Sequence, residues 1–295
     1  MGDRANFVVI RDGKPTLYHD NWCGRDVDLV LFWGPRDARD FIETRGPSDE
    51  WLNETWADGA AVYDEDHRVL TWFGGDGVGL GLVGRRAYLD LMRTQWPGWE
   101  VRWAHEGMTD IARLAGHPVE AILDPRRDPY PFALKSGGDA LLTLTVGGRA
   151  AWRRISGWVD GLEEGPAVVP RLLELHRDIA PLVTGRMPAL GLHVDVDRHT
   201  LHYWHDDSAA AIEARVAAAW PGWETVYLRD DVESQLRLSG LGLLLPWPSE
   251  RDVHTALLAR LEGATTVPAV SFIGDADARQ RFLSRLAVSW GLVEV

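Results

Sequence analysis

Hydrophobic and polar residues change their spacing in a fixed order within the second half of the chain. Residues 190–205, LGLHVDVDRHTLHYWH, alternate around a turn and predict two short strands. The following DDSAAAIEARVAAAW begins with capping residues and then places Ile212, Val216 and Ala219 at helical spacing. Pro221-Gly222 ends that helix, and WETVYL predicts a third strand. The order is therefore strand, strand, helix, strand.

The same order occurs in the first half of the chain. Residues 63–73, YDEDHRVLTWF, match residues 194–204, VDVDRHTLHYW, and a helix with Tyr88, Leu91 and Met92 on one stripe follows. The segment WPGWEVRWAHEGMTDIARLAG (96–116) then aligns without a gap with WPGWETVYLRDDVESQLRLSG (220–240). A repeat of this length indicates two copies of one unit. We interpret WPGWE as a structural corner, in which Pro-Gly turns the chain and two indoles pack beside it.

A second hairpin and helix precede each copy. Residues 7–19 predict a hairpin that turns at Asp12-Gly13, and residues 141–155 predict one that turns at Gly147-Gly148. We therefore expect an N-terminal repeat half over 1–130 and a C-terminal repeat half over 137–245. Residues 246–295 predict an α/β extension, with a helix at 249–261, a strand and a helix at 276–290, which packs on the repeats.

The predicted fold class is α+β, a tandem duplication of β-hairpin/helix units with a mostly antiparallel sheet and helices on one face.

The single cysteine, Cys23, excludes an internal disulfide and a cysteine-based zinc site. The N-terminal residues resemble neither a signal peptide nor a membrane anchor, and no apolar window is long enough to span a bilayer. These features predict a cytoplasmic protein that needs no cofactor.

Charge and tryptophan content favour a protein partner. The 31 basic and 44 acidic residues leave a formal net charge of -13, which disfavours non-specific binding to nucleic acid and favours a basic protein. The alternative is that the charge only maintains solubility. The chain has 15 tryptophans, and Trp51 and Trp56 lie in the acidic, turn-rich SDEWLNETWADG. We expect these two to bind the partner unless a long loop buries them.

The densest group of potential metal ligands is HVDVDRHTLHYWHDD, residues 193–207. A turn at Asp197-Arg198 pairs His193 with His202 and places Asp195 on the same face. These three side chains are candidate ligands for a divalent metal. The alternative is a solvated hairpin face, since the sister copy has Val62 and Thr71 at the two histidine positions.

A glycine-rich segment, FGGDGVGLGLVGRR, separates a predicted strand from a predicted helix in the first copy. Its glycines could let backbone N–H groups approach an anion, so the candidate ligand-binding loop comprises Gly77, Gly79, Gly81 and Gly84. The alternative is a plain flexible loop. The pattern does not predict the parallel strand-helix-strand unit that holds a dinucleotide.

The segment YHDNWCGRD places His19 near Cys23, and these two residues are a candidate pair for nucleophilic catalysis. No complete motif surrounds the pair, and a lone cysteine commonly fills apolar space.

Two functions follow from the sequence. The first is a soluble acidic binding protein, an immunity or antitoxin-like inhibitor of a basic toxin or nuclease. The alternative is a hydrolase or transferase with a site in the cleft between the duplicated halves. The sequence leaves open whether the protein is an enzyme.

Overall fold

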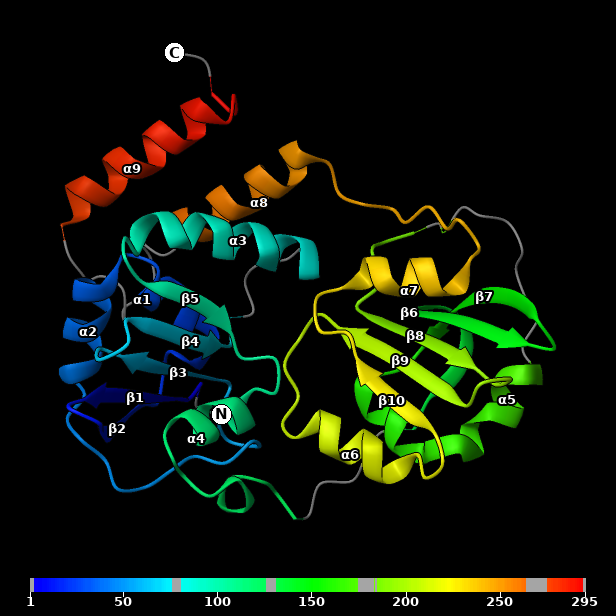
Figure 1. Ribbon diagram of the computed structural model, residues 1–295. Coiled ribbons are helices and arrows are strands. Elements are labelled where there is room, and N and C mark those ends of the chain that lie inside the picture. Colours follow the sequence, from blue (N-terminus) through cyan, green and yellow to red (C-terminus); the bar gives the residue numbers. More distant parts are fainter. Residues whose placement is uncertain are drawn as a thin grey trace. The chain divides into compact units, whose positions relative to one another are not determined.

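The computed structural model describes residues 3–75, 81–125, 131–174, 183, 185–263 and 275–293. The chain forms two compact units. Unit 1 comprises Met1–Pro125 and Pro248–Val295, and unit 2 comprises Arg126–Trp247. Each unit is built around one five-stranded sheet (Figure 1).

The sheet of unit 1 has the strand order β2-β1-β3-β4-β5. The hairpins β1–β2 and β3–β4 are antiparallel, whereas β1–β3 and β4–β5 are parallel. The strands are β1 (Ala5–Arg11), β2 (Lys14–Asp20), β3 (Gly59–Asp64), β4 (Val69–Phe73) and β5 (Glu100–Trp103).

Unit 2 repeats this topology with the order β7-β6-β8-β9-β10, and its pairings are parallel and antiparallel at the same places. The similarity of the two sheets agrees with the predicted duplication. The strands are β6 (Ala133–Val146), β7 (Arg149–Ser156), β8 (Leu190–Asp195), β9 (Thr200–His205) and β10 (Glu224–Tyr227).

The prediction of a mostly antiparallel sheet was wrong, because both sheets are mixed. A helix follows the second hairpin of each unit, α3 after β4 and α6 after β9. It returns the chain to the end of the sheet at which the preceding strand began. The next strand therefore runs parallel to the strand before the helix, which is the usual outcome of a strand-helix-strand connection. The local alternation of residues revealed the hairpins but not these parallel pairings.

Helices cover both faces of the unit 1 sheet, not one face as predicted. Alternate strand residues such as Phe7 and Tyr63 share an apolar cluster with α1, α2, α3, α8 and α9, while Val8 and Val62 pack on the opposite side with α4. Both sets of side chains are apolar, so both faces need cover. The helices are η1 (Gly24–Asp26), α1 (Val27–Leu31), α2 (Pro35–Glu43), α3 (Gly81–Gln95), α4 (Met108–Leu114), η2 (Val119–Ala121), α8 (Glu250–Gly263) and α9 (Ala276–Ser289).

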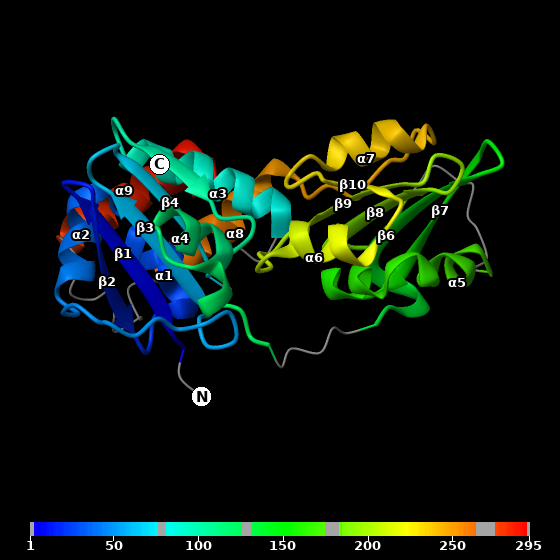
Figure 2. The same ribbon diagram turned by 60° about the horizontal axis from the view of Figure 1, so that its bottom comes forward.

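Helices also lie on both sides of the unit 2 sheet. Figure 2 shows α7 and α6 on opposite sides of it. The helices of this unit are η3 (Val159–Val168), α5 (Val169–Glu174), α6 (Ile212–Ala219) and α7 (Val232–Ser239).

The C-terminal extension packs on unit 1. Val253, Leu257 and Leu261 of α8 are buried in its larger apolar cluster. Arg260 also forms an ion pair with the fully buried Asp28, with Nη2 2.7 Å from Oδ1 and Nε 2.9 Å from Oδ2. Burial raises the pKa of Asp28, and Arg260 opposes that shift. The strand predicted between the two C-terminal helices lies outside the described residues.

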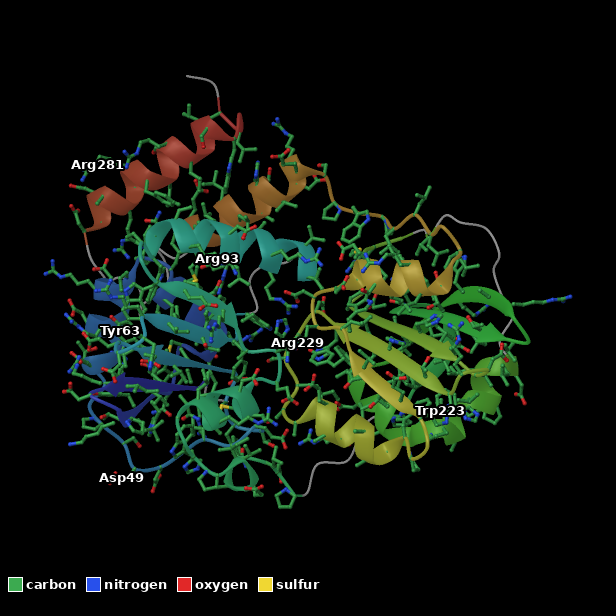
Figure 3. All side chains as sticks on the ribbon, in the orientation of Figure 1. Asp49, Tyr63, Arg93, Trp223, Arg229 and Arg281 are labelled. Atoms are coloured by element: carbon green, nitrogen blue, oxygen red, sulfur yellow. The ribbon has the colours of Figure 1, made fainter. Side chains whose placement is uncertain are left out.

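The two WPGWE segments form the same corner in both units. The buried Trp96 donates its Nε1–H to the Leu31 carbonyl oxygen at 3.0 Å, and Trp220 donates to the Leu162 carbonyl oxygen at 2.7 Å. Each meets the second tryptophan of its corner edge to face, with ring centroids 5.3 Å apart in unit 1 and 5.0 Å in unit 2. Figure 3 labels Trp223, the second tryptophan of the WPGWE corner in unit 2. A buried indole N–H needs an acceptor, which explains why this geometry recurs.

A carboxylate ties the two hairpin turns of each unit together. Asp66 accepts hydrogen bonds from the backbone N–H groups of Asp12 and Gly13 at 2.9 and 2.7 Å. Asp197 accepts from those of Gly147 and Gly148, both at 2.8 Å. These hydrogen bonds lower the pKa of both carboxyl groups, because they favour the ionised form. The hairpin turns therefore repeat as well as the strands.

Candidate functional site

A row of polar side chains crosses the middle of the unit 2 sheet on the face that α7 partly covers. Thr143 of β6 pairs with His193 of β8, which pairs with His202 of β9. Thr143 Oγ1 lies 3.0 Å from His193 Nδ1, and the two imidazole centroids are 6.1 Å apart. The structure therefore brings together the two predicted histidines and a threonine that the sequence analysis missed. We call Thr143, His193 and His202 the polar row.

Gln235 of α7 closes one side of the polar row. Its Nε2 donates to Thr143 Oγ1 at 3.1 Å and to the Leu192 carbonyl oxygen at 2.7 Å, and its Oε1 accepts from Trp204 Nε1 at 2.6 Å. Gly191 makes room for this contact, because a Cβ there would lie 2.0 Å from Trp204 Nε1 and 2.1 Å from Gln235 Oε1. The polar side chains of Thr143, Trp204 and Gln235 thus satisfy one another, whereas the buried Nδ1 of His202 has no hydrogen-bond partner among the described residues.

Both histidines of the polar row are neutral at neutral pH. Burial lowers the pKa of His193 to about 4, and the neighbouring His202 adds to this effect. Burial also lowers the pKa of His202. Neutral imidazoles can ligate a metal or accept a proton.

Asp195, the third predicted metal ligand, holds the adjacent turn. Its Oδ1 accepts the backbone N–H groups of Asp197 and Arg198 at 3.1 and 3.0 Å. Within the described residues, no group of three or more His, Cys, Asp or Glu side chains is arranged to hold a metal ion. The metal site of His193, Asp195 and His202 therefore stays a prediction, of which only the histidine pair has a direct geometric basis.

The candidate ligand-binding loop is described only in part. Gly77 and Gly79 lie outside the described residues, Gly81 is the first residue of α3, and Gly84 is buried within that helix. The flanking β4 and β5 are parallel and joined by α3, so the parallel strand-helix-strand unit that the sequence did not predict is present. An anion site at the loop stays a prediction.

The candidate catalytic pair has a different environment from the one a nucleophile needs. Cys23 is fully buried. Burial raises the pKa of its thiol well above the usual range, and the nearby Asp20 carboxylate raises it further. His19 Nδ1 lies 3.1 Å from Ser48 Oγ. A catalytic cysteine requires a lowered pKa and an accessible sulfur, so these surroundings favour a filler role for Cys23.

The two candidate partner-binding tryptophans differ in exposure. Trp51 is partly buried and stacks on His117, with ring centroids 4.3 Å apart. Trp56 is 54% exposed, and the Arg4 guanidinium lies 5.1 Å from its ring centroid. Trp22, which the sequence analysis did not select, is 73% exposed. Its position in the polar segment YHDNWCGRD, just after a predicted strand, was the available signal.

The two exposed indoles flank the first residues of unit 1. Trp22 forms a β-bridge with Asp3. The Arg4 side chain lies over Trp56, and its backbone forms two hydrogen bonds with Asp58. The Arg4 N–H donates to Asp58 Oδ2, and the Arg4 carbonyl oxygen accepts from the Asp58 N–H. We call Asp3, Trp22, Trp56 and Asp58 the acidic tryptophan patch.

The carboxylates of this patch lie in one another's field. Partial burial raises the pKa of Asp3, repulsion from Asp58 and Asp26 raises it further, and a hydrogen bond from the Arg25 N–H opposes the shift. A bound cation would relieve this repulsion. The patch therefore combines two exposed indoles, one of them beside the Arg4 guanidinium, with two neighbouring carboxylates.

Comparisons with protein-family models, with curated proteins and with solved structures found no match to this chain. None of the helices in the described part of the chain has the length and apolar character needed to cross a membrane.

Proposed function

We propose that this protein is an acidic binding protein that inhibits a basic toxin or nuclease, in the manner of an immunity protein or antitoxin. The observation that carries the proposal is the acidic tryptophan patch, where Trp22 and Trp56 are exposed beside carboxylates. The sequence already favoured a basic partner, and the patch supplies a specific surface for it.

The exposed indoles supply the short-range part of binding. Tryptophan is enriched among the residues that dominate interface energies, because it buries a large area with few rotatable bonds. Most of the Trp22 side chain is in contact with water. Burying this apolar surface against a partner would be favourable in free energy. An arginine or lysine of the partner can also stack on an indole face, as Arg4 does within this chain.

The charge supplies the long-range part of binding. A formal net charge of -13 steers a basic protein toward the chain and raises the association rate at low salt. Asp3 and Asp58 then concentrate negative charge beside the two indoles. We therefore place the partner's basic side chains at the patch.

The test is capture of a partner from the source organism, followed by assays with the purified pair. The partner should be basic, its catalytic activity should fall on addition of this chain, and raising the salt concentration should slow association. The double variant Trp22→Ala/Trp56→Ala should weaken the complex by about 100-fold, since each central indole contributes about 1–2 kcal/mol.

The matched control is Trp247→Ala, which removes a tryptophan of unit 2 that is 41% exposed. This variant should bind as the unchanged protein does. Equal affinity of the double variant and the unchanged protein would reject the patch, and a captured partner whose activity is unaffected would reject inhibition.

The enzymatic alternative, a hydrolase or transferase, draws on the polar row. A neutral His193 is a suitable proton acceptor, but its side chain is only 2% exposed and Thr143 beside it is fully buried. Turnover of a substrate that is lost in His193→Val would favour this alternative over inhibition.

A further inference from the structure

One tryptophan protrudes at the same corner of each unit. Trp22 follows β2 and is 73% exposed, and Trp158 follows β7 and is 72% exposed. The strands β2 and β7 are the equivalent edge strands of the two sheets. Trp158 immediately precedes η3, whereas Cys23 separates Trp22 from η1. Ala5 of β1 and Ala140 of β6 are equivalent positions, and they pair with Asp20 and Ile155. Trp22 lies two residues after Asp20 and Trp158 lies three residues after Ile155, so the two tryptophan positions differ by one residue.

The chain beyond these corners is different in the two units. Unit 1 continues into the helices α1 and α2, whereas unit 2 continues into the ten-residue η3 and the short α5. The indoles at the WPGWE corners are buried and hydrogen-bonded, so their retention has a structural cause. Trp22 and Trp158 bury little of their surface, and packing within the unit does not explain why both copies carry them.

Acidic residues accompany both protruding indoles. Asp20 accepts the backbone N–H of Trp22 at 2.7 Å, and Asp3 forms a bridge with that residue. Trp158 is followed by Asp160, Glu163 and Glu164, and its carbonyl oxygen accepts the Gly161 N–H at 3.0 Å. Some of these carboxylates already pair with arginine, since Asp20 lies 2.6 Å from Arg45 and Glu164 lies 2.5 Å from Arg171. Each of these two acidic segments therefore already binds one arginine of the chain.

We propose that Trp22 and Trp158 are two copies of one docking site, each for an arginine or lysine side chain of a basic polypeptide. One chain would then engage two basic segments, one on each unit. This inference rests on the proposed function for the class of partner, and it adds a second site that the acidic tryptophan patch does not include. The contact of the Arg4 guanidinium with Trp56 shows the same chemistry within the chain.

The test uses the full chain labelled with 5-fluorotryptophan and octa-arginine as the probe, followed by fluorine NMR at physiological ionic strength. The variants Trp22→Phe and Trp158→Phe assign the two signals, and Trp247→Phe assigns the signal of the control indole. Both corner signals should shift saturably with the same midpoint, while the Trp247 signal stays in place. Replacing either corner by alanine should weaken binding at that corner by about threefold to tenfold and leave the other unchanged.

The outcomes separate this inference from the proposed function. A shift of the Trp22 signal alone would overturn the second site and leave the acidic tryptophan patch as the partner surface. A shift of all three signals in parallel would show general attraction to acidic protein and would also overturn the second site. Absence of any shift would overturn both corners, and the capture experiment with Trp22→Ala/Trp56→Ala would then decide the proposed function on its own.

Discussion

The two units share a topology but differ in the interior beneath the short helix that covers one face of the sheet. In unit 1 this interior holds Val8 and Val62 beneath Ile111 of α4. In unit 2 the matching positions are Thr143, His193 and Gln235, and the Thr143 hydroxyl hydrogen-bonds to both of the others. Apolar packing in unit 1 and a hydrogen-bonded polar network in unit 2 therefore fill the same place in one architecture.

This difference shows which contacts carry the fold. The WPGWE corners and the carboxylates between the hairpin turns are the same in both units, and both are contacts between backbone groups and nearby side chains. The interior can change as long as each buried polar atom finds a partner. A specialised function is therefore more easily built into the face beneath α7 than into the corners.

The largest expected effect concerns a contact that unit 1 alone possesses, the ion pair of Arg260 with the buried Asp28. Arg260→Met leaves a buried carboxylate without its partner and should destabilise unit 1 by about 3–5 kcal/mol. Hydrogen exchange read by mass spectrometry should show faster exchange in α1, α3 and α8, and no change in unit 2. The control is Arg251→Met at an exposed position of the same helix. Equal loss in both units would contradict the separation of their cores.

The second prediction concerns the pH dependence of unit 2. Burial lowers the pKa of His193 to about 4, so the unfolded state takes up a proton at a higher pH than the folded state does. The stability of unit 2 should therefore decline as the pH falls from about 6.5 toward 4, by as much as about 3 kcal/mol. Urea unfolding followed at several pH values measures this decline.

His193→Val, which copies Val62 of unit 1, should remove most of that pH dependence. Unit 1 has no histidine at the matching position, so its stability over the same range serves as the internal control. An unchanged pH dependence in the variant would show that other groups control the acid response of unit 2.

The third prediction concerns the space that the polar network occupies. Gly191→Ala places a methyl group against Trp204 and Gln235 and should destabilise unit 2 by about 1–3 kcal/mol. Unit 1 carries Ala60 at the matching position, where it is fully buried in an apolar cluster with Phe73 and Ile111. Adding Gln235→Ile and Trp204→Phe, the residues of unit 1 at those positions, should restore much of the stability. Thermal unfolding of the single and triple variants checks this rescue, and a triple variant weaker than the single one would refute the equivalence of the two faces.

The smallest expected effect tests what the units share. Trp96→Phe and Trp220→Phe each remove an indole donor from a buried carbonyl oxygen, and each should cost about 1–2 kcal/mol in its own unit. Hydrogen exchange at the β4–β5 and β9–β10 pairings should rise by similar amounts. A clear difference between the two costs would show that one corner has become less important than the other.

The sequence by itself determined the duplication, the hairpins and the corners, because each is encoded by residues close together in the chain. Asp12-Gly13 and Gly147-Gly148 specify turns, and WPGWE carries both the turn and the indoles that pack beside it. The pairing of His193 with His202 also followed, since strand register within a hairpin is set by the turn.

Only the tertiary structure decided how distant segments meet. The parallel pairings β1–β3 and β6–β8, the cover on both sheet faces and the contact of Gln235 with Thr143 join residues far apart in the chain. Exposure was likewise undecided by the sequence, because Trp51 and Trp22 both lie among polar residues, yet His117 stacks on the first and the second stays open. Local spacing encodes the form of a segment, whereas burial depends on which other segments pack against it.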